Sequence, residues 1–311
     1  MSGKLAVVAG TGPMRALVTR LARERGEPHE VFAIAPLLPM GQDAPSLHPF
    51  RFAQILDMLR RDDIGSAYLC GNFPLGRQLQ AALCGYYAPL ATWIGDRLFI
   101  DTMLRTSPAN SYAIRYLASL GLLLADAGVR LRCARDVFPQ LAIRAGTLTR
   151  HAPDERILAA TADVMVALEK AFAKLPQRRV RLAQAGIVED GRITSIEWSS
   201  TDRLLRRARR EAGRSDTRYL VKMPSVGFEP ALDQPTIGPK TAQGCIDAGL
   251  SGLIVCAELT LLIEPKRTID LLDRAGLFLH ALPLAEVCRA YQDAFACDWA
   301  EWLAAARPAH V

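Results

Sequence analysis

One acidic residue stands in a polar segment between two apolar runs. The segment "ALDQPTIGPKT" (231–241) has Asp233 as its one carboxylate. Gly238 and Pro239 fit the N-cap and N1 positions of a following helix, so amide groups of its first turn should point back toward Asp233. A carboxylate there could ligate Mg²⁺ or orient a water, while the amides hold phosphate oxygens. The alternative is a turn in which Asp233 bonds only to its own backbone.

Residues near this segment could serve the same chemistry. Pro235 restricts the residue before it to extended geometry, which stiffens the segment. Lys222 ends an expected strand just ahead of the segment and could pair with a phosphate or face water. The sequence "SSTD" begins another expected helix, with Thr201 or Asp202 as its cap.

A second candidate site lies near the N-terminus. The stretch "GTGP" (10–13) places Gly10, Thr11 and Gly12 between an expected strand and an expected helix. Glycine lets the backbone approach a ligand, and the helix N-terminus offers N–H groups to a phosphate. Arg15 stands where the dinucleotide fingerprint has its third glycine, and the acid expected after the second strand is absent. A plain tight turn and an anion site both remain open.

The composition excludes several classes of protein. With 311 residues, 50% of them hydrophobic and 23% charged, the chain should form two globular domains. No apolar run reaches the roughly 18 residues of a membrane span, and the N-terminus lacks the pattern of a signal peptide, so we expect a cytoplasmic protein. The seven cysteines form no C-x-x-C pair and are typical of buried apolar positions. Neither H-E-x-x-H nor G-x-S-x-G occurs, so zinc hydrolases and serine hydrolases are not indicated.

Arginines are concentrated in one expected helix. The net charge is +6, and "DRLLRRARREAGR" places Arg203, Arg206, Arg207, Arg210 and Arg214 on one helical face. This face is either a solvated surface or a contact with phosphates or an anionic membrane. Nucleic acid is not expected as a partner, because no RNA-binding or zinc-finger signature occurs and aromatic residues do not interleave with the arginines.

Strand and helix patterns alternate in the first half of the chain. This alternation predicts a mostly parallel sheet with right-handed crossovers, in a Rossmann-like domain over 1–135. The expected strands are 4–9, 29–35, 66–70 and 129–133, the expected helices are 14–26, 50–64 and 110–128, and a loop is expected at 37–49.

The second half predicts another α/β domain, over 136–282, with a mixed sheet. A hairpin should turn at Asp190 and Gly191, because "DG" is a strong hairpin signal. Further strands are expected at 218–223, 252–256, 260–263 and 277–281, and helices at 154–175, after Ser199, after Gly238 and at 265–275.

Residues 283–311 predict an amphipathic helical tail. Its apolar stripe includes Tyr291 and Trp299, while Glu286 and Asp293 lie on the polar face. Acidic residues match anionic lipid poorly, so we expect the tail to pack on the core or on a second subunit, as in a homodimer.

The chain resembles the LpxI family. The stretch "YLVKMPSVGFEPALDQPTIGPKTAQGCIDAGLSGLIV" is similar to the family's C-terminal signature, V-K-x-x-K-P-x-Q-D-x-R-x-D-x-P-x-I-G-P-x-T, with no gap over 221–241. "AQAGIVEDGRITSIEWSSTD" and "VVAGTGPM" resemble two further family motifs. The resemblance covers most of 4–281 and is strongest over 180–281.

The resemblance implies two α/β domains with the active site between them. It implies cleavage of UDP-2,3-diacylglucosamine, a UDP-sugar lipid of lipid A biosynthesis, to UMP and 2,3-diacylglucosamine 1-phosphate, with Mg²⁺ (or Mn²⁺) as cofactor. Asp233 aligns with the family's essential aspartate and would be the catalytic, metal-handling carboxylate; Glu197 also matches the pattern. Contact of the arginine face with the inner membrane is a further expectation. The implied substrate-binding residues are Gly10, Thr11, Gly12, Gln184, Thr201, Asp202, Lys222, Pro235, Thr236 and Gly238.

Several family residues are replaced in this chain. The family's Lys, Gln, Asp and Arg in the Asp233 segment become Ser225, Phe228, Glu229 and Ala231. The replaced groups are polar ones that we would expect to bind substrate or metal. Two alternatives therefore stand beside the pyrophosphatase. One is a catalytically inactive relative that binds a nucleotide-sugar or regulates another protein, and the other is a hydrolase of a different nucleoside diphosphate conjugate.

Overall fold

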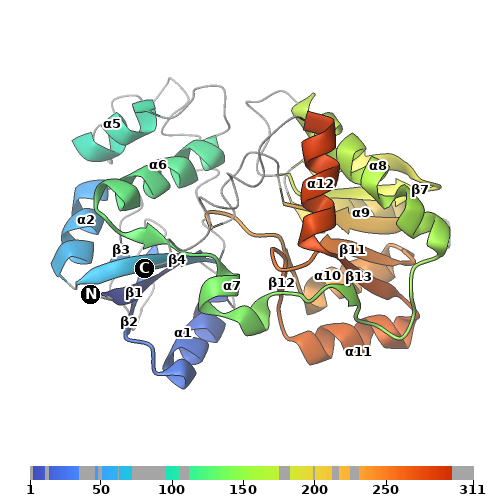
Figure 1. Cartoon of the computed structure of the whole chain (residues 1–311), viewed down its shortest axis with the longest axis horizontal. Coiled ribbons are helices and arrows are strands. Elements are labelled where there is room, and N and C mark those ends of the chain that lie inside the picture. The colour runs from blue at the N-terminus through green and yellow to red at the C-terminus, as the bar shows by residue number, and fades with distance from the viewer. Residues whose placement is uncertain are drawn as a thin grey trace. The chain divides into compact units, whose positions relative to one another are not determined.

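The protein consists of two compact α/β units, Met1–Phe138 and Pro139–Val311 (Figure 1). The computed structural model describes residues 3–10, 14–34, 46–47, 51–61, 63–71, 96–105, 112–174, 183–198, 200–211, 217–224 and 231–295. The expected fold class, two α/β domains with a helix after the second, is confirmed. Within the described residues, no helix combines the length and the apolar character needed to cross a bilayer.

The N-terminal unit is built on a parallel sheet. Its strands are β1 (Lys4–Ala9), β2 (His29–Ile34), β3 (Ser46–Leu47), β4 (Ile64–Cys70) and β5 (Arg130–Leu131), in the order β3-β2-β1-β4-β5. Every pair is parallel, as the alternating pattern predicted, and the order is that of doubly wound sheets. The expectation of loop throughout 37–49 is wrong at β3, and β5 is shorter than expected. A two-residue strand has no periodicity from which it could be predicted.

The N-terminal unit also contains helices, some of which meet through aromatic contacts. They are α1 (Met14–Arg25), α2 (Phe52–Arg61), α5 (Arg97–Arg105), α6 (Tyr112–Asp126) and α7 (Ala134–Val137). The Phe52 ring meets those of Phe99 and Tyr116 edge-on, with centroid separations of 5.2 and 5.9 Å, so α2, α5 and α6 form one layer (Figure 1).

The C-terminal unit has a mixed six-stranded sheet. Its strands are β6 (Gly146–Thr147), β7 (Ala185–Glu189), β8 (Arg192–Ile196), β9 (Tyr219–Lys222), β11 (Gly252–Cys256) and β13 (Phe278–Leu282), in the order β6-β13-β11-β9-β7-β8. The central strands β9, β11 and β13 are parallel, and β7 and β8 form the predicted hairpin. Asp190 and Gly191 both have positive φ, as this type of turn requires. A separate parallel pair joins β10 (Thr236–Ile237) to β12 (Leu261–Leu262).

Two helical layers cover the two faces of this sheet (Figure 1). The helices are α8 (Glu155–Ala173), α9 (Thr201–Arg210), α10 (Pro239–Asp247), α11 (Pro265–Ala275) and α12 (Leu284–Phe295), with a short 3₁₀ turn at Pro139–Leu141. Leu168 of α8 and Tyr291 of α12 belong to one buried cluster, while α9, α10 and α11 contribute to the cluster on the opposite face. The described part of the expected tail therefore packs on the core of its own unit.

A buried arginine joins the C-terminal ends of α9 and α10. Arg218 donates from Nη2 to the Ala208 carbonyl (3.1 Å) and from Nη1 to the Ala248 carbonyl (3.4 Å). A positive charge at these carbonyls complements both helix dipoles. The two helices also approach closely, because a Cβ placed on Gly244 would lie 2.8 Å from Cδ1 of Leu205. Helices α9 and α10 are thus fixed to one another.

Glycine 252 gives a test of the packing in the sheet. Gly252 pairs with Phe278 in register, and a Cβ on Gly252 would lie 2.4 Å from the Phe278 ring. Gly252→Ala should lower the free energy of unfolding by about 1–3 kcal/mol, because the buried ring must move. Calorimetric melting of the full chain measures this. Gly244→Ala is the control: its nearest neighbour is the end of a flexible side chain, and alanine favours the helix by up to about 1 kcal/mol. Equal melting temperatures for the two variants would contradict this account.

Candidate active site

Three polar side chains gather at the carboxyl end of the parallel strands of the C-terminal unit. Lys222 ends β9, Gln184 immediately precedes β7, and Glu197 follows β8. Their backbones are locked together, since Met223 N–H donates to the Gln184 carbonyl and Glu197 N–H donates to the Ala185 carbonyl, both at 2.8 Å. Ligand sites of α/β sheets are generally found at this edge.

A hydrogen-bonded cluster connects these residues to Asp233. Gln184 Nε2 donates to Asp233 Oδ2 (2.8 Å), and the Gln184 backbone N–H donates to Glu197 Oε2 (3.2 Å). Lys222 Nζ donates to Thr201 Oγ1 (2.9 Å), which in turn lies 3.5 Å from both carboxylate oxygens of Glu197. We call these five residues the Asp233 cluster. All are buried except Asp233, which keeps part of its surface exposed.

Burial changes the acidity of both carboxyl groups in the cluster. Burial, opposed by the charge of Lys222 and assisted by that of Glu197, raises the pKa of Asp233 from 3.8 to about 7. Burial also raises the pKa of Glu197, against the effects of Lys222 and of hydrogen bonds from Gln184, Ala185 and Thr201. Asp233 can therefore gain or lose a proton near neutral pH, which is the property required of a general base.

The N-terminal ends of α9 and α10 meet beside the cluster. Thr201 is the first residue of α9, and Gly238 is the N-cap of α10, as predicted. Lys240 of α10 donates to Asp202 of α9, so an ion pair joins the two first turns. The first amide groups of each helix have no partner within the helix, and together with the dipoles they favour an anion.

The cap of α9 differs from the prediction. Ser200 is the N-cap, and its Oγ accepts a hydrogen bond from the backbone N–H of Arg203 (3.3 Å), so the assignment to Thr201 or Asp202 is wrong. Three successive residues are good caps, and the backbone decides which of them has the extended conformation. As a result, the Thr201 hydroxyl takes part in the Asp233 cluster, and Asp202 pairs with Lys240.

The other candidate residues lie outside the cluster. The Pro235 carbonyl accepts from Leu261 N–H (2.8 Å), and the Thr236 hydroxyl donates to the Gln234 carbonyl (3.1 Å). Gly10 directly follows β1 in the N-terminal unit, and its N–H donates to the Cys70 carbonyl (2.8 Å). Thr11 and Gly12 are outside the described residues. Glu197 was not among the predicted site residues, although it matched the family pattern.

The cluster fits a cation that is bound jointly with a substrate. In the part of the chain that the structure describes, no three His, Cys, Asp or Glu side chains are grouped as a metal site. Mg²⁺, however, is often held by one or two carboxylates together with substrate phosphates and water. Asp233 fits that role, because it is partly exposed and Gln184 bonds to only one of its oxygens.

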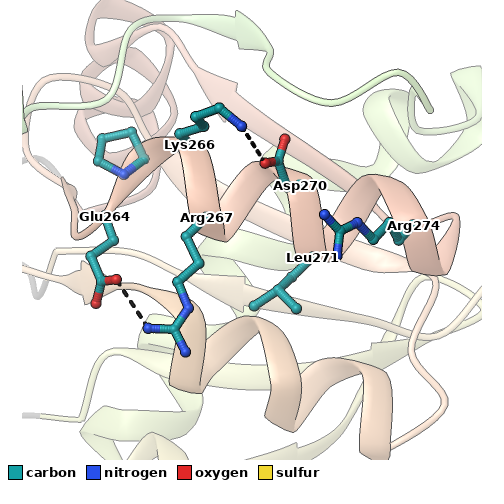
Figure 2. A pocket seen from close by; sticks show the side chains of 7 residues that line it. Glu264, Lys266, Arg267, Asp270, Leu271 and Arg274 are labelled. Carbon is teal, nitrogen blue, oxygen red and sulfur yellow. Dashed lines mark hydrogen bonds and ion pairs between the residues drawn. The ribbon is translucent and has the colours of Figure 1, made fainter.

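A hollow of about 450 Å³ lies on α11, away from the residues of the Asp233 cluster (Figure 2). Its charges are paired with one another: Lys266 Nζ lies 2.7 Å from Asp270 Oδ2, and Arg267 Nη1 lies 3.1 Å from Glu264 Oε2. No group there is buried or aimed at a common point, so the Asp233 cluster is the better candidate site.

The fold and the cluster together define an α/β protein with an acid–lysine site at the carboxyl edge of its C-terminal sheet. Residues 144–280 match the LpxI C-terminal domain. A 159-residue stretch is 30% identical to the UDP-2,3-diacylglucosamine pyrophosphatase LpxI of Caulobacter vibrioides and covers 49% of this chain and 55% of that protein. The match thus spans about half the length of this curated relative. The resemblance to the LpxI family is thus confirmed over the C-terminal domain, residues 144–280.

Among solved structures, the GalE-like L-threonine dehydrogenase from Cupriavidus necator aligns over 93% of this chain and 99% of its own. The sequence identity is 11% and the TM-score is 0.27, so this likeness supports no conclusion about fold or function.

The raised pKa of Asp233 predicts a pH-dependent stability. Between about pH 4 and pH 7 the folded chain keeps a proton on Asp233 that the unfolded chain has lost, so this group's contribution to stability falls as the pH rises through that window. Asp233→Asn stays neutral throughout. Its melting temperature should therefore rise relative to that of the wild type across the window, in buffer without divalent cations. A constant difference between the two proteins would contradict the raised pKa.

Lysine 222 should be required for stability because it is the buried charge that offsets two carboxyl groups. Lys222→Met should lower the free energy of unfolding by about 3–5 kcal/mol, as measured by urea titration near neutral pH. Combining it with Glu197→Gln should restore part of the loss. Lys240→Met removes an exposed lysine from an ion pair and should cost about 1 kcal/mol or less. If Lys222→Met and Lys240→Met lower the free energy of unfolding equally, the charge of Lys222 does not stabilise the Asp233 cluster.

Proposed function

We propose that this protein is a hydrolase that cleaves the pyrophosphate of UDP-2,3-diacylglucosamine to UMP and 2,3-diacylglucosamine 1-phosphate. The observation that carries the proposal is the position of Asp233. It stands where the family has its essential aspartate, within hydrogen-bonding reach of Gln184 and in the electrostatic field of Lys222. The name of the Caulobacter relative supports the same substrate.

The geometry provides what pyrophosphate hydrolysis requires. The reaction needs a positioned water and neutralisation of charge on the phosphate oxygens, more than a protein nucleophile. Asp233, with a pKa of about 7, accepts the proton of the water whose oxygen bonds to phosphorus as the anhydride bond breaks. Gln184 holds the carboxyl group in place, and Lys222 with the first-turn amides of α10 stabilises negative charge.

A divalent cation such as Mg²⁺ or Mn²⁺ is part of the proposal. Held by Asp233 and by the substrate phosphates, it would neutralise charge and lower the pKa of a bound water. We further propose that the enzyme acts in the cytoplasm on a lipid-linked substrate. The apolar side of α12 packs on the core of its own unit, so the described part of the tail gives no ground for proposing a homodimer.

One observation favours a second candidate function, a nucleotide-sugar-binding protein without catalysis. The family has an arginine at the position of Ala231, which is buried in this chain. Because alanine has no guanidinium, this position supplies none to the substrate. Arginine is well suited to holding phosphate in two hydrogen bonds, and its loss removes a direct means of stabilising a transition state. Ser225, Phe228 and Glu229 lie outside the described residues.

Release of UMP tests the leading proposal. Purified full-length protein should release UMP from UDP-2,3-diacylglucosamine in Mg²⁺ or Mn²⁺, and Asp233→Ala should reduce the rate by about 10²–10⁴-fold, because the proton acceptor is lost. Asp270→Asn is the matched control, since it changes an exposed aspartate of the same unit outside the cluster.

The outcomes separate the three hypotheses. Equal rates for wild type and Asp233→Ala would overturn the role of Asp233. A folded wild type that binds the substrate by calorimetry but releases no UMP with either cation would be the binding protein. Turnover of another nucleoside diphosphate conjugate, with none of the lipid, would identify a hydrolase of different specificity.

A further inference from the structure

Helix α9 presents arginines to solvent on the side opposite its buried face. Thr201, Leu204, Leu205 and Ala208 are buried against the sheet. At 100° per residue, Arg203, Arg206, Arg207 and Arg210 fall within an arc of about 100° on the other side, and all four are exposed. We call these four residues the arginine face. Arg214, which was expected to extend it, lies outside the described residues.

Negative charge balances the arginine face only in part. Arg207 pairs with Glu211 at 2.8 Å. Among the described residues, Arg206 and Arg210 have no ion-pair partner. Helix α11 is different, because Lys266 pairs with Asp270 one turn along the helix and Arg267 pairs with the N-cap Glu264, as Figure 2 shows. The charge imbalance is therefore a local property of α9.

Stability of α9 does not account for this pattern. Cations near the C-terminal end of a helix are favourable, which explains Arg207 and Arg210. Arg203 lies in the first turn, where a positive charge opposes the dipole, and Arg206 lies near the middle. The arginines at positions 203 and 207, and at 206 and 210, also repel one another at i,i+4 spacing. Such an arrangement is expected where an external anion compensates the repulsion.

The first turn of α9 links the arginine face to the candidate active site, because Arg203 is exposed on one side of this turn and Thr201 is buried on the other. Thr201, the first residue of α9, belongs to the Asp233 cluster. Trp198 lies two residues before the N-cap and exposes 50% of its surface. Indole rings favour the interface between water and lipid headgroups, where one part of the ring is apolar and another can donate a hydrogen bond.

We propose that the arginine face binds the anionic surface of a lipid bilayer and thereby brings the Asp233 cluster to a membrane-borne substrate. The second clause rests on the proposed function, while the first does not. A basic stripe gains attraction to anionic lipid with each arginine. Since the apolar side of α9 is buried in its own unit, the helix binds at the surface and does not insert.

Phosphates of nucleic acid share this chemistry, but the described surface of α9 favours lipid. The exposed face has no Asn or Gln to contact base edges and no aromatic ring within the helix on which bases could stack. RNA binding is therefore an outcome of the test.

Flotation with vesicles tests the arginine face directly. Full-length protein is mixed with vesicles of phosphatidylcholine, with or without phosphatidylglycerol. The wild type should float only with the anionic vesicles, and less at high salt. Arg206→Gln combined with Arg210→Gln should lower the partition coefficient roughly 10- to 30-fold. The matched control, Arg267→Gln with Arg274→Gln on α11, removes the same charge from the same unit and should change it less than about twofold. Arg206→Lys with Arg210→Lys should keep the binding.

Several results would overturn the proposal. The first is that the α9 and α11 variants lose vesicle binding equally, and the second is that the wild type floats equally well without phosphatidylglycerol. The third is that an RNA oligomer displaces the protein from vesicles and binds through the same arginines. Circular dichroism should show that all variants are folded, since every changed side chain is exposed.

The enzymatic part is measured separately. The α9 variant should release UMP at the wild-type rate from substrate in detergent micelles and more slowly from substrate in anionic vesicles. If the α9 variant and the wild type release UMP at equal rates in vesicles as well as in micelles, the arginine face does not bring the enzyme to a membrane-borne substrate. If the wild type releases no UMP in either medium, the proposed function fails, while the flotation result still decides whether the arginine face binds lipid.

Discussion

The buried ammonium group of Lys222 is the constraint on which the candidate site depends. A charge at the carboxyl end of a central strand must be compensated, because burial without a partner is strongly unfavourable. Glu197 follows β8, Thr201 begins α9, and Asp233 precedes β10, so three separate segments supply that compensation. Burial in this cluster raises the pKa of Asp233 against the charge of Lys222, and Asp233 lies beside the N-terminal ends of two helices. Folding and chemistry therefore use one set of interactions.

Much of the fold could be predicted, because its signals are local. Pro265 and Gly276 mark the two ends of α11, and the Asp190–Gly191 turn identifies the β7–β8 hairpin. Two-residue strands such as β3 and β6 depend on pairing with distant segments, so no local pattern reveals them. The prediction of the N-cap of α9 was wrong for a related reason. Neighbouring Ser and Thr side chains can both cap the helix, and tertiary contacts decide which of them does.

The candidate site was predictable only in part. Asp233 could be singled out from its segment, and the family resemblance brought in Gln184, Thr201 and Lys222. Their meeting in space depends on the register of β7 against β9, in which Ala185 pairs with Lys222, and on the hairpin that returns Glu197 to the same edge. Neither is encoded in spacing along the chain. The residues that match the family pattern and bond to one another here are buried, apart from the partly exposed Asp233, whereas a buried alanine, Ala231, replaces the arginine of that pattern.

Arg218 has a consequence for how such a site can change over evolutionary time. Its guanidinium ties α9 and α10 together at the ends remote from the Asp233 cluster, through backbone carbonyls that a residue of any type provides. The opposite ends of the same helices carry the groups that face a ligand. The C-terminal ends of α9 and α10 are thus held by Arg218, while their N-terminal ends lie beside the candidate site. Residues at those N-terminal ends outside the Asp233 cluster can therefore be exchanged while the frame keeps its shape, whereas the buried members of the cluster are also needed for stability.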